Sequence, residues 1–127
     1  MKEETISRIA IILLAIVMAV FGVYHFMQPE NLIVWVPNFL PGGRYLWIYV
    51  AGAAFILAAL ALITNRQVKL AGYVLAGILF LFVLTIHLPT YLNAGDKEMQ
   101  QVAFVNLLKD TAIAAFALHI AANSKNK

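Results

Sequence analysis

The chain consists of four long apolar runs separated by short segments that hold most of its charges. The runs cover about residues 6–27, 44–63, 70–88 and 101–122. An α-helix rises about 1.5 Å per residue, so each run can cross the roughly 30 Å hydrocarbon core of a bilayer. The pattern predicts an all-α fold: an integral membrane four-helix bundle that forms one transmembrane domain over residues 1–127.

The composition is typical of a protein that is surrounded by a lipid bilayer, and we expect the bilayer to be its partner. Hydrophobic residues make up 63% of the chain and charged residues 12%, whereas about a quarter of a typical water-soluble domain is charged. The net charge of +3 comes mostly from basic residues at the ends of the runs, so we expect no nucleic-acid partner. The chain has no cysteine, which excludes thiolate-ligated metals and disulfides.

The basic residues predict the orientation of the bundle. Most of them fall on the side that holds both termini and the turn between the second and third runs, and this side is expected to be cytoplasmic. We therefore expect an N-in/C-in protein, in a bacterial inner membrane because the compact chain shows no organelle signal. The cytoplasmic side carries Lys2, Arg8, Arg66, Lys69, Lys125 and Lys127, and the other side carries Arg44 and Lys97.

The outer segment at residues 28–43 is too apolar for a hydrated loop. We expect it to lie along the outer surface or to fold back as a lid over the bundle. Pro29 and Pro89 are expected to stop the first and third helices, because proline cannot extend a helix.

Small and polar side chains predict how the helices pack, since lipid gives them no hydrophobic reason to associate. In the fourth run such residues share one face, which we expect to contact the other helices: Ala103, Asn106, Asp110, Ala114, Ala117 and Ala121. Four large residues of this run are expected to face lipid or a partner protein: Val105, Ile113, Phe116 and Ile120. Small residues at helical spacing also occur at Ala54 and Ala58, and at Gly72 and Ala76.

Asp110 is the most informative residue, because an unpaired carboxylate inside a membrane helix costs about 2.5–3.5 kcal/mol on insertion scales. Asn106 lies on the same face and is expected to donate an amide hydrogen bond to it. Lys109 points about 100° away and is expected to extend outward, so it is not an expected partner.

An outer-half polar cluster is expected, made of His25, Arg44, His87, Asn106 and Asp110. One interpretation is polar contacts that fix the helix arrangement. A second is a binding site for a quinone-like headgroup, which exchanges protons as it is reduced. A third is a b-type haem with His25 and His87 as axial ligands, although two histidines in four helices are a common coincidence. His119 lies on a different face and is expected to be interfacial.

Short motifs in this chain resemble those of the DoxX-like family of small four-helix membrane proteins. Residues 21–29 read FGVYHFMQP and residues 36–41 read VPNFLP, similar to the family's Gly–His-Phe–Pro signature and proline-bracketed outer segment. Residues 106–110 read NLLKD, similar to an Asn-Leu-x-Lys-Asp segment of DoxX proteins. The sequence departs from that pattern after Gly52, where Phe55 stands in place of an acidic residue that many relatives carry.

The resemblance implies a four-helix membrane fold and an association with quinone-linked sulfur oxidation and membrane oxidoreductase assemblies. More distant relatives act as assembly factors or chaperones for membrane proteins. Glycine-rich phosphate loops, zinc motifs and nucleophile elbows are absent from the sequence, so we expect no catalytic activity of its own.

Three functions remain open from the sequence. The first is a non-catalytic accessory subunit of a quinone-linked membrane redox complex. The second is an assembly factor, chaperone or stabilising interaction subunit that contacts another membrane protein. The third is a small transporter that works as a homo-oligomer.

Overall fold

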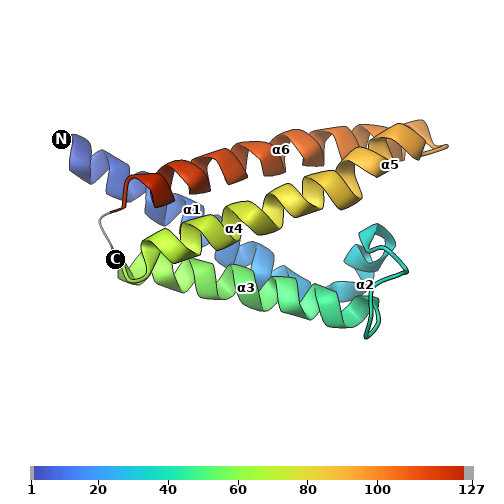
Figure 1. Ribbon diagram of the computed structural model, residues 1–127, viewed down its shortest axis with the longest axis horizontal. Coiled ribbons are helices and arrows are strands. Elements are labelled where there is room, and N and C mark those ends of the chain that lie inside the picture. Colours follow the sequence, from blue (N-terminus) through green and yellow to red (C-terminus); the bar gives the residue numbers. More distant parts are fainter. Residues whose placement is uncertain (1, 125–127) are drawn as a thin grey trace.

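In the computed structural model, which describes residues 2–124, helices are joined by short connections (Figure 1). No strand occurs in this part of the chain, which confirms the all-α prediction. The elements are α1 (Glu3–Met27), α2 (Pro29–Leu32), the 3₁₀ turn η1 (Ile33–Trp35), α3 (Arg44–Thr64), α4 (Val68–Phe82), the π-helical turn η2 (Val83–His87), α5 (Leu88–Asn93) and α6 (Lys97–Ala122).

Four helical stretches within residues 2–124 are long and apolar enough to cross a membrane, as predicted. They are α1, α3, the continuous stretch Val68–Asn93 and α6. The fourth begins before the predicted start at residue 101, because the Asp96 carboxylate accepts the backbone N–H of Glu98 at 3.0 Å and caps the helix. Lys125 and Lys127, which the predicted orientation uses, lie outside the described residues.

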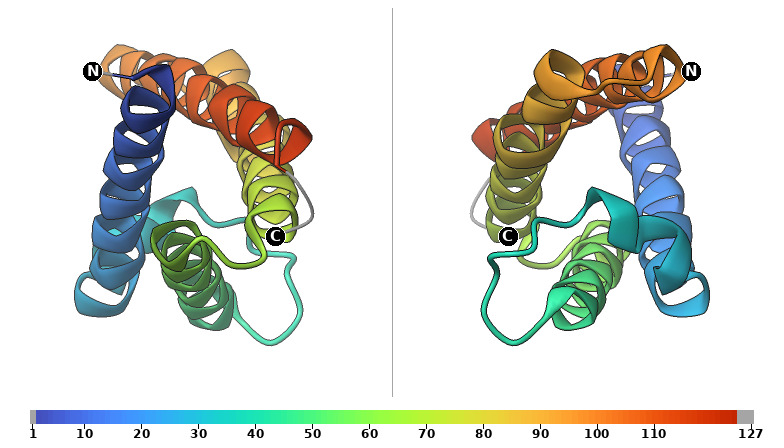
Figure 2. Two further views of the ribbon diagram at one scale, coloured as in Figure 1. Left: turned by 90° about the vertical axis from the view of Figure 1, so that its left-hand side faces the viewer. Right: turned by 90° about the vertical axis from the view of Figure 1, so that its right-hand side faces the viewer.

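The helices associate as two pairs, α1 with α3 and α4 with α6. The pairs meet mainly where α3 turns into α4, and they draw apart toward the end that holds α2 and α5 (Figures 1 and 2). A common apolar core still joins them, because buried side chains of α1, α3, α4 and α6 form one cluster.

Glycines set the closest approach within each pair. A Cβ atom on Gly22 would lie 2.8 Å from the carbonyl oxygen of Gly52, and a Cβ on Gly72 would lie 2.8 Å from that of Ala117. Both distances are too short for a real carbon, so only glycine lets these backbones come together. The pairs therefore use the small-residue packing that is typical of membrane helices.

The buried face of α6 is wider than the predicted stripe. Ala103, Asp110, Ala114, Ala117 and Ala121 are buried as predicted. The prediction that Ile120 faces outward is wrong: Ile120 belongs to the core, and Ile113 and Phe116 pack partly against that core. The reason is that Ile120 packs into the apolar cluster that the long helices share, so more than one narrow arc of α6 is buried. Val105 is exposed.

The third long helix does not stop at Pro89, so that prediction is wrong. Pro89 lies in the first turn of α5, and the helix continues to Asn93. A proline has no N–H and its ring crowds the carbonyl four residues earlier. The preceding turn widens into a π-turn, in which the N–H of Leu88 bonds the carbonyl of Val83 five residues back, and the chain passes the proline without ending the helix.

The outer segment between α1 and α3 folds back onto the bundle at η1. Arg44 donates a hydrogen bond to the carbonyl of Ile33 at 3.3 Å, and the Trp47 indole donates to the carbonyl of Pro41 at 2.6 Å. These bonds connect the segment to the first turn of α3. The ring of Trp35 reaches the bundle, whereas Phe39 is 80% exposed.

Candidate functional site

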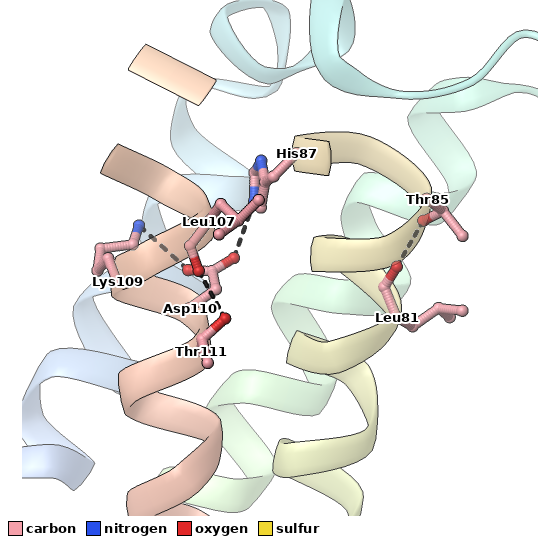
Figure 3. A network of polar contacts seen from close by, with 7 residues as sticks. All are labelled: Leu81, Thr85, His87, Leu107, Lys109, Asp110 and Thr111. Carbon is pink, nitrogen blue, oxygen red and sulfur yellow. Dashed lines mark hydrogen bonds and ion pairs between the residues drawn. The ribbon is translucent and has the colours of Figure 1, made fainter. Parts of the chain in front are cut away.

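A buried hydrogen-bonded pair joins the π-turn η2 to the middle of α6. His87 Nε2 lies 2.9 Å from Asp110 Oδ2, and the two side chains are 10% and 7% exposed (Figure 3). The backbone around Asp110 is flanked by small buried residues, Ala103 and Ala114, which leave room for the imidazole. Asp110 therefore has the donor from another helix that its position in an apolar run requires.

The π-turn is what keeps His87 on the buried face. Leu75, Leu79, Val83 and His87 follow at intervals of four residues, and all four are buried. In a regular α-helix, each step of four residues drifts by about 40° around the axis. The wider turn at Val83–His87 offsets this drift, so the imidazole points toward α6 rather than toward the surface.

Lys109 is the second partner of Asp110, which corrects the prediction that it extends away. Its Nζ lies 3.4 Å from Asp110 Oδ1 and 4.7 Å from the centre of the Phe21 ring (Figure 3). The flexible stem of lysine bends along the helix surface and places the ammonium beside the carboxylate. The contact with Phe21 is a cation–π interaction between α6 and α1.

His87 Nδ1 is buried and has no hydrogen-bond partner among the described residues. A carboxylate only accepts hydrogen bonds, so the proton of a neutral His87 is assigned to Nε2, and Nδ1 then offers a free acceptor. In the protonated ring, Nδ1 carries an N–H without an acceptor. In either state this atom lacks a partner that buried polar groups normally have.

Trp35 from the outer segment packs against His87. The ring centres are 6.4 Å apart and the planes are tilted by 66°. In Figure 3 the nitrogen of His87 that is not bonded to Asp110 points toward the outer segment. The lid interpretation of this segment therefore applies at Trp35, whose ring packs against the ring of His87.

The other predicted cluster members lie elsewhere. His25 Nδ1 lies 2.6 Å from the carbonyl of Phe21, and the His25 ring packs edge-on against Phe55. Arg44 binds the outer segment. Asn106 is half-buried, and the expected Asn106–Asp110 hydrogen bond is not present, since His87 and Lys109 are the partners of that carboxylate.

The histidines do not fit a shared haem. Two axial ligands must face the two sides of one porphyrin. In this structure Phe55 lies against His25 and Trp35 lies against His87, and no ring contact joins the two histidines within residues 2–124. Residues 2–124 also contain no group of three or more side chains that could hold a metal ion.

Sequence reasoning missed Lys109 as a partner of Asp110, Phe21 as a contact of Lys109, and Trp35 as a neighbour of His87. The spacing of Thr85 and Pro89 was an available signal for the π-turn, because the ring of Pro89 crowds the carbonyl of the residue four positions earlier. The placement of Trp35 has no such signal, since it depends on how the outer segment folds back.

A family model described as a domain of unknown function (DUF8561) matches residues 14–121, which is most of the chain. The matched range includes all the residues of the buried pair and its neighbours. No curated protein and no solved structure matches the chain.

Proposed function

We propose that this chain, which belongs to the DUF8561 family, is a non-catalytic accessory subunit of a quinone-linked membrane redox complex. In this proposal all four long helices cross a bacterial inner membrane and both termini are cytoplasmic. The observation that carries the proposal is the buried His87–Asp110 pair, in which His87 Nδ1 has no hydrogen-bond partner among residues 2–124 and the His87 ring packs against Trp35.

The proposed membrane orientation rests on the outside of the bundle and on its charges. Large apolar side chains are exposed along every long helix, including Leu13, Leu57, Leu81 and Val105. Such a surface is stable when lipid covers it. The excess of basic residues at the end with both termini supports a cytoplasmic location for that end.

The chemistry of the pair suits a headgroup that changes its protonation. Asp110 holds one nitrogen of the imidazole, which leaves Nδ1 for a ligand. A neutral His87 accepts a hydrogen bond from a quinol hydroxyl at Nδ1, and a protonated His87 donates one to a quinone carbonyl. The electrons come from the oxidoreductase partner, so this chain contributes binding and a proton-exchanging contact.

The resemblance to DoxX-like proteins supports the same proposal. Two of the three stretches that carry the resemblance meet at the site: Phe21 belongs to the first stretch, and Lys109 and Asp110 belong to the last. Many DoxX-like relatives carry an acidic residue three positions after a glycine, where this chain has Phe55 packed against the rings of His25 and Phe82. The absence of that acidic residue agrees with an accessory role.

Mild-detergent purification of the tagged protein from its native host tests the proposed complex. Co-purification of a stoichiometric oxidoreductase supports the accessory role. The matched variants are His87→Gln, which removes the pair, and Thr111→Ala, which changes an exposed neighbour that bonds only its own helix at the carbonyl of Leu107. Recovery of secretion or receptor components in place of an oxidoreductase contradicts the proposal.

A second candidate function is a stabilising interaction subunit or assembly factor that binds no ligand. The observation that favours it is the role of the pair within the bundle, because His87 and Asp110 connect η2 to α6 and Lys109 connects α6 to α1. Under this alternative His87→Gln lowers the amount of protein in the membrane. Under the accessory role the protein level remains and the ligand is lost.

A further inference from the structure

Lys109 occupies the middle of α6. It is the thirteenth of the 26 residues of α6, so about 18 Å of helix lies on either side of its Cα atom. A lysine side chain spans only about 6 Å and cannot carry its ammonium to either end of a helix of that length. The charge must therefore be compensated at the depth where it lies.

The compensation within the chain is incomplete. Asp110 Oδ2 lies 2.9 Å from His87 Nε2, and Asp110 Oδ1 lies 3.4 Å from Lys109 Nζ. The second distance is longer than the roughly 2.7–2.9 Å of a strong charge-assisted hydrogen bond. An ammonium has three N–H donors, and with one directed to Asp110 and one to the Phe21 ring, a donor remains. The Lys109 side chain is 41% exposed.

The face of α6 around Lys109 is apolar and open. Val102, Val105 and Lys109 follow at spacings of three and four residues, so they share one side of the helix. Val102 is 43% exposed and Val105 is 61% exposed. Phe21 of α1 borders this face at the Lys109 ammonium. An exposed apolar helix face that ends at one cationic group has the form of a helix–helix interface that requires an acidic counterpart.

A second copy of this chain does not supply that counterpart. The chain has six acidic residues, Glu3, Glu4, Glu30, Asp96, Glu98 and Asp110. The first five lie at helix ends or in the outer segment, and Asp110 is buried with 7% of its side chain exposed. No exposed carboxylate of a second molecule therefore lies near the middle of a long helix.

We infer that the α6 face formed by Val102, Val105 and Lys109, together with Phe21 of α1, binds a transmembrane helix of a different protein that carries a carboxylate near its middle. This inference rests on the proposed accessory function, because it names the chemistry by which the chain meets its membrane partner. The carboxylate accepts the free N–H of Lys109, and apolar side chains of the partner helix cover the two valines.

A synthetic helix of about 21 leucine and alanine residues with a central Glu tests this inference in phosphatidylcholine vesicles. Matched peptides carry Gln or Leu at the same position. The full chain has no cysteine, so Asn123→Cys provides one labelling site at the exposed end of α6 for resonance energy transfer to a labelled peptide. We expect the Glu peptide to bind about tenfold more tightly than the Leu peptide.

Variants separate the role of Lys109 from general helix association. Lys109→Met is expected to bind the Glu and Leu peptides equally, whereas Lys109→Arg keeps the preference for Glu. Lys97→Met, which removes a charge at the end of α6, is the matched control and is expected to behave as the wild type. The Leu peptide reports whether each variant still presents the apolar face.

Equal binding of the Glu and Leu peptides by the wild type, or an unchanged preference in Lys109→Met, overturns the inference. Energy transfer between two copies of the chain that depends on Lys109 also overturns it, because the partner would then be the chain itself. The assay contains neither a quinone nor an oxidoreductase. A negative result in the peptide-binding assay therefore does not bear on the co-purification of an oxidoreductase. If no oxidoreductase co-purifies, the peptide-binding result can still be interpreted.

Discussion

His87 and Asp110 are 23 residues apart in the chain, and their side chains meet at 2.9 Å in the interior of the bundle. The pair depends on two backbone features. The π-turn before Pro89 directs the imidazole inward, and the small residues of α6 leave space around the carboxylate. The Asp110 carboxylate also contacts Lys109, whose ammonium lies over the Phe21 ring of α1. Asp110 therefore connects α6 to η2 directly and to α1 through Lys109.

Asp110→Ala is expected to destabilise the bundle by about 1–3 kcal/mol, because it leaves the buried His87 without its acceptor and Lys109 without its counter-charge. Asp110→Asn keeps an acceptor and a similar volume, so its cost is expected to be smaller. Unfolding in detergent micelles followed by circular dichroism measures both. Thr111→Ala serves as the control for a change in the neighbouring residue, and wild-type stability in Asp110→Ala would contradict the buried pair.

Gly52→Ala is expected to separate α1 from α3. A Cβ at this position would lie 2.8 Å from the Cβ of His25 and 3.0 Å from the carbonyl oxygen of Gly22, so the backbones must move apart. We expect a loss of about 1–3 kcal/mol, the usual cost of overpacking. The midpoint of thermal unfolding in micelles is the measurement.

Gly77→Ala is the matched control for this substitution. Gly77 is also within a long helix, but a Cβ there meets no heavy atom within 4 Å. The substitution is expected to raise stability by up to about 1 kcal/mol, because alanine is the better helix former. An equal response of the two glycines would show that the α1–α3 crossing is not at Gly22 and Gly52.

Trp35→Ala is expected to open His87 to chemical modification. Diethylpyrocarbonate modifies accessible imidazole nitrogens, and the ring of Trp35 packs against the ring of His87. Peptide mass spectrometry is expected to show slow modification of His87 in the wild type and faster modification in the variant. Phe39→Ala removes an exposed aromatic ring of the same segment and is expected to leave His87 protected. The same rate in all three proteins would exclude a covering role for Trp35.

The proposed orientation predicts opposite labelling of two turns. The chain has no cysteine, so single substitutions Asn65→Cys, in the turn between α3 and α4, and Gly95→Cys, between α5 and α6, can be compared directly. In intact cells a membrane-impermeant maleimide is expected to label Gly95→Cys but to reach Asn65→Cys only after lysis. The reverse pattern would place both termini outside.

The regular parts of the fold were predictable because they depend on local patterns. Four apolar runs of helical length follow from the sequence alone, and the alanine positions of α6 that face the other helices follow from a period of 3.6 residues. The burial of Asp110 follows from the cost of leaving a carboxylate in an apolar run.

The incorrect predictions concern interactions between elements. Ile120 is buried because it packs into an apolar cluster formed by several helices, which a single helical projection does not include. Lys109 turns back to Asp110 because its flexible stem follows the nearest opposite charge. The helix continues past Pro89 because the wider π-turn before it makes room for the proline ring. The contact between Trp35 and His87, which was not predicted, depends on how the outer segment folds back.

The quinone content of the purified protein tests the central claim most directly. Wild type, His87→Gln and Thr111→Ala are purified in the same mild detergent, and quinone is extracted and quantified per mole of folded protein. The account predicts near-stoichiometric quinone in the wild type and in Thr111→Ala, and at least a tenfold loss in His87→Gln, about 1.4 kcal/mol of binding free energy or more. Equal quinone content in wild type and His87→Gln would contradict a binding role for His87 and leave the pair with a structural role.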